Sequence, residues 1–168
     1  MKLILSLFLL LISVSASAQI EWMSWEEAIE RSKSEPRRLI VDVYTDWCGW
    51  CKRMDKTSFR DKAVVRYINE NFYAVKLDAE QRESINYDGH EFAYDETVGR
   101  RGVHQLAVAL LDGRMSYPSL VYLDAEQKRI SISPGFKPAE NLLKEIQYIG
   151  GGHYTSSTFE EYLEAASK

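Results

Sequence analysis

The chain has 168 residues and a net charge of −4 at pH 7, with 45% hydrophobic and 27% charged residues. This length is sufficient for one domain with a hydrophobic core, and the chain contains no long basic run of the kind that binds nucleic acid. Beyond the first residues, no segment is apolar over the length of a membrane span. The composition therefore indicates a globular protein with no nucleic-acid partner.

The N-terminus has the pattern of a signal peptide. Lys2 gives a positive start, residues 3–12 are almost entirely apolar, and residues 16–18 (Ala-Ser-Ala) match a small-x-small cleavage site. The apolar run is short for a membrane anchor, and a retained N-terminal helix is the alternative. We expect residues 1–18 to be removed on export. This leaves one domain of 150 residues, 19–168, and a net charge of −5, because only Lys2 is lost.

The first half of the chain alternates helix and strand signals. Ser24 and Glu27 fit a capping box at the start of a helix that Pro36 ends. Residues 39–44 (LIVDVY) form a short, mostly apolar and β-branched run, which is typical of a buried central strand. Two cysteines follow, and residues 51–57 contain no helix breaker, so we expect a helix to begin at the cysteine motif.

The second half continues this alternation. Predicted strands cover residues 73–77, 119–123 and 128–133, and the last two are close enough to form a hairpin. Predicted helices cover residues 61–71 and 103–111, a segment that begins at Pro138, and a last segment that Thr158 caps. This order describes one α/β domain, in which helices flank a central mixed sheet on both faces.

Cys48 and Cys51 are the two cysteines of the chain, and Gly49 and Trp50 separate them. A disulfide across so short a loop stabilises a fold little, so the spacing favours redox chemistry over a structural role. A zinc site needs four ligands, and the chain has no second cysteine pair and no histidines at a matching spacing. We expect neither a metal nor another cofactor.

Residues 39–52 (LIVDVYTDWCGWCK) resemble the active-site segment of thioredoxins, in which a buried strand ends just before a W-C-x-x-C-K motif. Residues 52–59 (KRMDKTSF) are more similar to the reducing thioredoxin-like domains of bacterial periplasmic proteins. Tyr117-Pro118 stands before a strand, where thioredoxins carry a cis-proline. The resemblance covers residues 24–149 and implies a thioredoxin fold with an insertion before the cis-proline strand and an extra C-terminal helix.

The resemblance and the predicted helix assign roles to three residues. Cys48 is expected at a helix N-terminus, where free N–H groups and the helix dipole favour the thiolate, so it is the predicted attacking residue. Cys51, one turn further, is the predicted resolving thiol and the partner of Cys48 in a disulfide. By resemblance, Asp42 assists deprotonation of Cys51. The alternative is a buried carboxylate that backbone donors satisfy, with no part in turnover.

Five residues around the thiols are expected to contact substrate. Trp47 and Trp50 would offer apolar surface to an extended partner, although Trp47 could instead belong partly to the core. Gly49 lies between the thiols, and Tyr117 precedes the expected cis-proline. Pro118 lacks a backbone donor, which lets neighbouring backbone pair with a substrate strand, and in the resembling family it keeps metals away from the thiols.

The chain departs from thioredoxin in two places. Gly49-Trp50 replaces the Gly-Pro of thioredoxin, and because this dipeptide helps to set the reduction potential, the direction of electron flow stays open. The second departure is an insertion at about residues 81–101, where Asp88-Gly89 is a hairpin-turn signal. The insertion is either a rim that selects partners or a surface addition with no role.

The sequence favours a monomeric, periplasmic disulfide reductase that acts on disulfides or thiols of exported proteins. Its electron donor would be a membrane thiol-reductant conductor. The similarity of residues 52–59 to reducing domains supports this hypothesis, as does the absence of a dimerisation domain of the kind an isomerase needs. Two alternatives remain: a dithiol oxidase that donates its disulfide, and a non-catalytic binding module.

Overall fold

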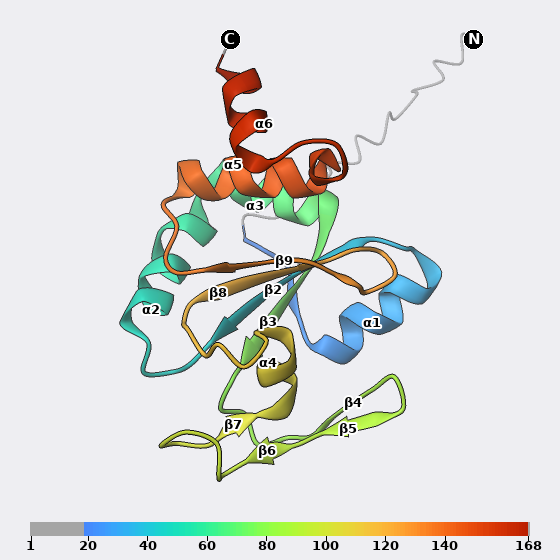
Figure 1. Ribbon diagram of the computed structural model, residues 1–168, viewed down its shortest axis with the longest axis vertical. Helices are drawn as coiled ribbons and strands as arrows, with labels where there is room; N and C mark the ends of the chain where they lie inside the picture. The colour runs from blue at the N-terminus through green and yellow to red at the C-terminus, as the bar shows by residue number, and fades with distance from the viewer. Residues whose placement is uncertain (1–18, 168) are drawn as a thin grey trace, which may run out of the picture.

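The computed structural model describes residues 19–167, so the predicted signal peptide lies outside the described residues. At its centre is a five-stranded sheet with the order β1-β3-β2-β8-β9 (Figure 1). The strands are β1 (Trp22–Met23), β2 (Arg38–Tyr44), β3 (Phe72–Asp78), β8 (Ser119–Leu123) and β9 (Arg129–Pro134). β2 pairs in parallel with β3 and antiparallel with β8, which confirms a mixed sheet.

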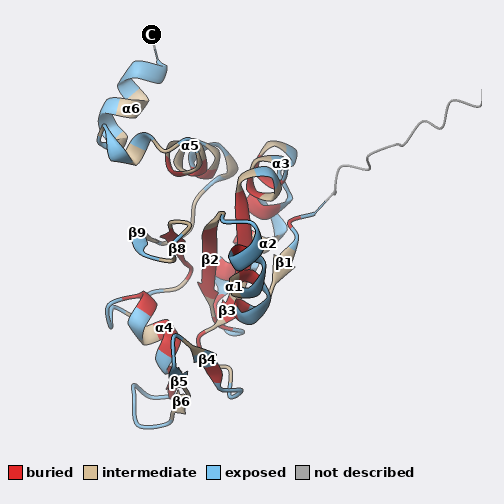
Figure 2. Ribbon diagram, turned by 90° about the vertical axis from the view of Figure 1, so that its right-hand side faces the viewer, coloured by how far each residue is buried: buried red, intermediate tan, exposed pale blue. Residues whose placement is uncertain are grey.

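Helices flank both faces of this sheet (Figure 1). They are α1 (Trp25–Ser34), α2 (Gly49–Lys56), α3 (Lys62–Asn71), α4 (Gln105–Leu110) and α5 (Ala139–Gly150), with 3₁₀ turns at Ser58–Arg60 and His153–Thr155. The last helix, α6 (Phe159–Ala166), packs against α5 on the side away from the sheet (Figure 1). The buried residues concentrate in the central strands and on the inward faces of the helices (Figure 2). Within residues 19–167, no helix combines the length and the hydropathy that a membrane crossing requires.

Two apolar cores lie on opposite faces of the sheet, because side chains alternate along a strand. Leu39 and Val41 of β2 belong to the core that includes residues of α1 and α4. Ile40 belongs to the other core, which includes Met54 of α2 and residues of α3 and α5. Asp42, two residues after Ile40, therefore lies on the sheet face that α2 covers.

The local helix signals are confirmed at both ends of the domain. Ser24 and Glu27 form the capping box of α1, and Thr158 and Glu161 form that of α6. Each box satisfies backbone N–H groups that the first helical turn leaves without partners.

The helix predicted over residues 103–111 is wrong at its start, because Val103 and His104 form strand β7 instead. β7 pairs with the short strand β6 (Tyr94–Asp95), and α4 begins only at Gln105. Gly102, at a φ of +76°, turns the chain into β7. The side chain of His104 then caps α4 by accepting a hydrogen bond from the Leu106 N–H.

The inserted segment folds into two short ribbons. In the first, β4 (Ile85–Tyr87) pairs with β5 (His90–Phe92). Asp88 and Gly89 turn between them with φ angles of 49° and 73°, as the hairpin signal predicted. The ring of Tyr87 meets that of Trp25 edge-on at 5.1 Å, which packs the hairpin against α1. The second ribbon, β6 with β7, leads the chain back to α4.

Candidate active site

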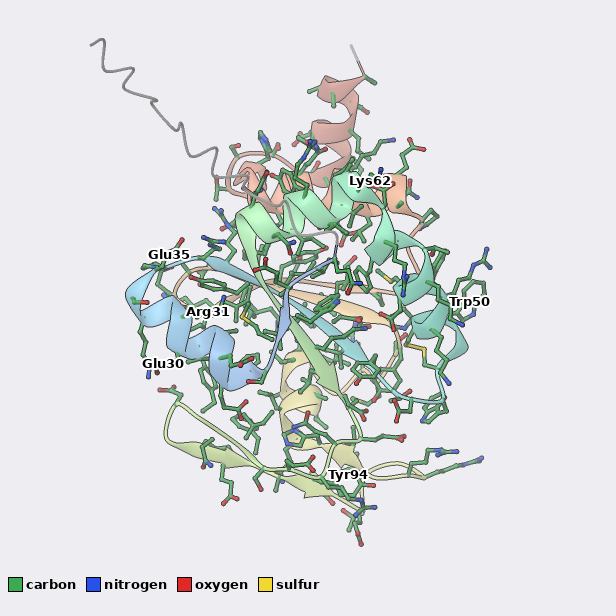
Figure 3. All side chains as sticks on the ribbon, turned by 180° about the vertical axis from the view of Figure 1, so that it is seen from behind. Glu30, Arg31, Glu35, Trp50, Lys62 and Tyr94 are labelled. Atoms are coloured by element: carbon green, nitrogen blue, oxygen red, sulfur yellow. A yellow bond between two sulfur atoms is a disulfide. The ribbon has the colours of Figure 1, made fainter. Side chains whose placement is uncertain are left out.

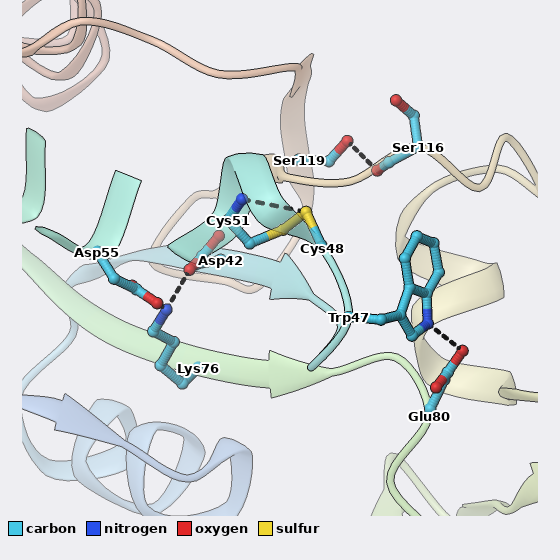
Figure 4. The surroundings of a disulfide bond; sticks show 9 residues. All are labelled: Asp42, Trp47, Cys48, Cys51, Asp55, Lys76, Glu80, Ser116 and Ser119. Carbon is cyan, nitrogen blue, oxygen red and sulfur yellow. Dashed lines mark hydrogen bonds and ion pairs between the residues drawn. A yellow bond between two sulfur atoms is a disulfide. The ribbon is translucent and has the colours of Figure 1, made fainter. Parts of the chain in front are cut away.

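Cys48 and Cys51 lie at the N-terminus of α2, directly after the loop that follows β2 (Figure 4). Their sulfur atoms form a disulfide, with 5.3 Å between the Cα atoms. Cys48 is the N-cap residue, and its Sγ accepts a hydrogen bond from the Cys51 N–H at 3.0 Å. The two residues are almost equally buried, at 5% and 3% exposure, so helix position rather than burial distinguishes them. Only Cys48 stands where the free N–H groups of the first turn stabilise a thiolate.

Asp42 is buried beneath this helix and pairs with a lysine. Its Oδ2 lies 2.6 Å from Nζ of Lys76, which faces it across the β2–β3 pair. Its Oδ1 has no hydrogen-bond partner among the described residues. Burial raises the pKa of Asp42 to about 6 even though the Lys76 ammonium lowers it. The buried charge of Asp42 is thus stabilised by the Lys76 ammonium and not by backbone donors.

Lys76 also contacts a second carboxylate, that of Asp55 in α2, at 2.5 Å. Its Nζ lies over the rings of Trp22, Tyr44 and Phe59 at 5.0, 4.7 and 5.4 Å, close enough for cation–π attraction. Burial opposes the charged form, but the two carboxylates outweigh it and raise the pKa of Lys76. Lys76 is not among the site residues predicted from the sequence. The sequence does contain a signal for it: Lys76 interrupts the apolar run FYAVKLD, just as Asp42 interrupts the apolar run LIVDVY. Two opposite charges in two buried strands indicate an ion pair between them.

Trp47 directly precedes Cys48, and Trp50 lies between the two cysteines. Both side chains are about half-exposed, and neither belongs to an apolar core. Nε1 of Trp47 donates to Oε1 of Glu80 at 2.8 Å, and its ring meets that of Tyr117 edge-on at 6.0 Å. Trp50 projects outward from α2 (Figure 3), and its ring lies 5.4 Å from that of Phe136. Both indoles therefore offer apolar surface that neighbouring aromatic rings support.

The Tyr117–Pro118 peptide bond is cis and immediately precedes β8. Pro118 is buried, and together with Trp50, Tyr117, Gly135 and Phe136 it lines a hollow beside the cysteine motif. Burial raises the pKa of Tyr117 to about 12, so its hydroxyl stays neutral at physiological pH. Gly49 is exposed, and a Cβ at this position would meet no other atom within 4 Å. Gly49 thus faces open space, whereas Trp50 packs against Phe136.

Among the described residues, no group of three or more His, Cys, Asp or Glu side chains is placed to hold a metal ion. Cys48 and Cys51 are joined to each other. What the arrangement offers chemically is a reducible disulfide above a buried acid whose pKa lies near neutrality.

The mixed sheet, the flanking helices, the cis-proline and the cysteine pair at a helix N-terminus define a thioredoxin-like protein of the thiol–disulfide oxidoreductase class. Residues 6–149 match the model of one family in this class, described as "Thioredox_DsbH: Protein of unknown function, DUF255". The chain belongs to this family.

Individual relatives are more distant. The chain is 25% identical over 124 residues to the disulfide bond reductase DsbH of Chlamydia pneumoniae, covering 73% of this chain and 67% of the relative. It is 26% identical over 127 residues to an uncharacterized Caenorhabditis elegans protein, covering 75% of this chain but only 15% of that much longer relative. The solved structure of a thioredoxin-fold protein from Helicobacter pylori superposes with a TM-score of 0.63 at 17% identity, covering 92% of this chain and 95% of the other.

Proposed function

We propose that the protein is an exported disulfide reductase that uses Cys48 and Cys51 to reduce disulfides of exported proteins. The observation that carries the proposal is the placement of a redox-active pair at the start of α2, above the buried Asp42–Lys76 ion pair. The name of the Chlamydia pneumoniae relative, a disulfide bond reductase, supports the reducing direction.

In the reduced protein, the Cys48 thiolate attacks one sulfur of a substrate disulfide. A mixed disulfide forms, and the other substrate sulfur leaves as a thiolate that takes up a proton. Asp42, on the sheet face that α2 covers, accepts the Cys51 proton. The new Cys51 thiolate attacks Cys48 Sγ, and the second substrate sulfur leaves as a thiolate that takes up a proton. The substrate leaves with two thiols, and two electrons have passed from the protein, which now holds the Cys48–Cys51 disulfide.

The proposal includes a cellular setting. Residues 1–18 act as a cleaved signal peptide, residues 19–168 form the thioredoxin-like domain, and the domain works as a monomer in the periplasm. A membrane thiol-reductant conductor returns two electrons to the disulfide. The charge pattern at Lys2 and the Ala-Ser-Ala sequence at residues 16–18 support export. Mass spectrometry of protein recovered from the periplasm tests this, since the expected mature chain begins at Gln19.

Insulin reduction by the protein, with Cys48→Ser as control, tests the activity. We expect turnover by the wild-type protein and none by the variant, whereas equal rates would favour a non-catalytic binding module. The reduction potential, measured against glutathione, tests the direction. A value near −270 mV, about that of thioredoxin, supports a reductase, and one near −120 mV, about that of a strong oxidant, supports a dithiol oxidase.

A further inference from the structure

The exposed apolar side chains gather around one site. Among residues 19–167, the exposed large hydrophobic residues are Trp47, Trp50 and Val98, at 52%, 54% and 37% exposure. Trp47 precedes Cys48, Trp50 lies between the two cysteines, and Val98 comes from the inserted segment, far along the chain. Single exposed apolar residues are ordinary on protein surfaces, whereas their concentration at one site indicates a binding surface.

Val98 and Trp47 line the same groove, which we call the insertion groove. It has a volume of about 300 Å³, and its lining is predominantly apolar. Its walls are residues 98–103 on one side and Trp47, Glu80, Met115 and Tyr117 on the other. This volume is at the small end of the range for small-molecule pockets, roughly 300–1,000 Å³, and suits one or two side chains of an extended polypeptide.

Tyr117 connects the insertion groove to the reacting sulfurs. It lines this groove and also the hollow that Trp50 and Pro118 form beside the cysteine motif. A substrate strand that crosses the motif at the cis-proline can therefore continue past Tyr117 into the insertion groove.

The wall that residues 98–103 form is held in place by contacts within the inserted segment. The Tyr94 hydroxyl donates to the Arg101 carbonyl, and the Arg82 guanidinium lies 4.5 Å from the Tyr94 ring. Gly102 packs so closely on this ring that a Cβ there would overlap the Tyr94 hydroxyl. The wall is thus held beside Trp47 by contacts within the inserted segment, and binding need not order it first.

Two arginines give this wall a positive charge. The guanidinium carbon of Arg101 lies 5.7 Å from the centre of the Trp47 ring, and Arg100 also lines the groove. Neither arginine forms a salt bridge with another described residue. Glu80 is the one acidic residue of the lining, and one of its oxygens already accepts the Trp47 N–H. The groove therefore favours an acidic ligand, although the protein as a whole is negative.

We propose that the insertion groove binds an extended segment of a substrate protein in which a large apolar side chain stands next to an acidic one, near the cysteine under exchange. The apolar side chain packs between Val98 and Trp47, and the carboxylate meets Arg100 and Arg101. This inference deepens the proposed function and rests on it, since it names the substrate class that the Cys48 site selects.

The test uses the Cys51→Ala variant and short cysteine peptides activated as 2-thiopyridyl disulfides. Cys48 attacks the peptide sulfur, the sulfur–sulfur bond to the pyridyl group breaks, and 2-thiopyridone leaves as a coloured product. Three peptides carry Leu-Asp, Leu-Lys or Ser-Asp beside the cysteine. We expect Leu-Asp to react about fivefold faster than Leu-Lys, the scale of one accessible ion pair. It should react about tenfold faster than Ser-Asp, from partial burial of the leucine.

One substitution in the groove should change the preference for charge, and another should change the preference for an apolar side chain. Arg101→Glu should reverse the order of Leu-Asp and Leu-Lys, and Val98→Ser should reduce the preference for leucine over serine. Arg66→Glu is the matched control, because Arg66 is exposed on α3 and the charge change is the same. Preferences that persist unchanged in Arg101→Glu and Val98→Ser would overturn the inference.

A neutral small disulfide, 2,2′-dithiodipyridine, separates this inference from the proposed function. If Cys48 reacts with it while the three peptides react equally, the groove has no selective role and the exchange chemistry stands. If Cys48 does not react with it, the proposed function is wrong. The groove is then judged by fluorescence anisotropy, with the same peptides carrying serine in place of cysteine. Equal affinities there would overturn the inference, and preferential binding of the Leu-Asp peptide would support it.

Discussion

Asp42 and Lys76 occupy matching positions in the parallel strands β2 and β3, and their side chains meet 2.6 Å apart on the sheet face that α2 covers. A buried ion pair is costly to desolvate, and here the attraction outweighs the desolvation penalty on Lys76 but not that on Asp42. For Asp42 the desolvation penalty prevails, and its pKa is raised to about 6. The site thus holds an acid that can exchange a proton near neutral pH.

Removal of the cation should raise the pKa of Asp42 further. In Lys76→Met the desolvation penalty on the carboxylate persists without the opposing ammonium, so the carboxyl should titrate above pH 6. Carbon-13 NMR of the Asp42 carboxyl in the oxidised protein measures this directly. Lys62→Met, at an exposed position of α3, removes the same charge far from the acid and should leave the titration unchanged. An Asp42 pKa that falls in Lys76→Met would contradict this electrostatic account.

Removal of the second carboxylate should act in the opposite direction. The Asp55 charge raises the pKa of Asp42, and Asp55 also binds the ammonium that Asp42 uses. Asp55→Asn should therefore lower the Asp42 pKa, by less than Lys76→Met raises it, in the same NMR titration. Glu70→Gln, at an exposed position of α3, is the charge-matched control. If the Asp42 pKa shifts in the same direction in Asp55→Asn and Lys76→Met, structural disturbance rather than charge sets this pKa.

Asp42→Asn should stabilise the fold at pH 7 while it impairs turnover. The Asp42 pKa is higher in the folded state than the ordinary 3.8, so wild-type stability falls as the pH rises from about 4 to 6 and the penalty is complete above that. This shift already includes the attraction of Lys76, and two pKa units correspond to about 3 kcal/mol, so the gain in stability at pH 7 should be about 2–3 kcal/mol.

Urea unfolding at pH 4 and pH 7 measures this difference, which should nearly vanish at pH 4. Release of a mixed disulfide should slow roughly 100-fold in the same variant, because Cys51 loses its proton acceptor. A variant of unchanged stability at both pH values would show that burial does not penalise the Asp42 charge. A variant that releases substrate at the wild-type rate would remove Asp42 from the mechanism.

The features predicted from sequence depend on neighbours in the chain. The capping box of Ser24 and Glu27, the β-branched run of β2 and the Asp88-Gly89 turn each act within a few residues, so their patterns are visible in the sequence. The same holds for Cys48 at the start of α2, since the strand before it and the unbroken helix after it are both local signals.

The features that were missed depend on residues far apart in sequence. Lys76 meets Asp42 across 34 positions, and only the register of two strands brings them together. β1 and β6 are two residues long, too short to show a period of two. Val103 has the spacing of a helix face, yet pairing with β6 draws it into a strand. Tertiary pairing decides such positions, and local propensity does not.

His104 should make the fold sensitive to acid. It is fully buried, its Nδ1 accepts the Leu106 N–H that opens α4, and Nε2 lies 3.2 Å from the Glu83 carbonyl of the insertion. Burial lowers the pKa of His104, so the stability it contributes is present above its unfolded pKa of about 6.5 and is lost as the pH falls. Protonation would place a hydrogen on Nδ1, where Leu106 already donates.

His104→Asn should retain the cap and remove this sensitivity, because asparagine is a good N-cap residue and does not titrate. We expect it to lose about 1 kcal/mol at pH 7, from the broken contact to Glu83, and to lose less stability than the wild type between pH 7 and pH 5. His153→Asn, at an exposed position, should behave like the wild type. Urea midpoints at the two pH values provide the comparison. If His104→Asn and the wild type lose equal stability between pH 7 and pH 5, protonation of His104 is not the cause of the acid sensitivity.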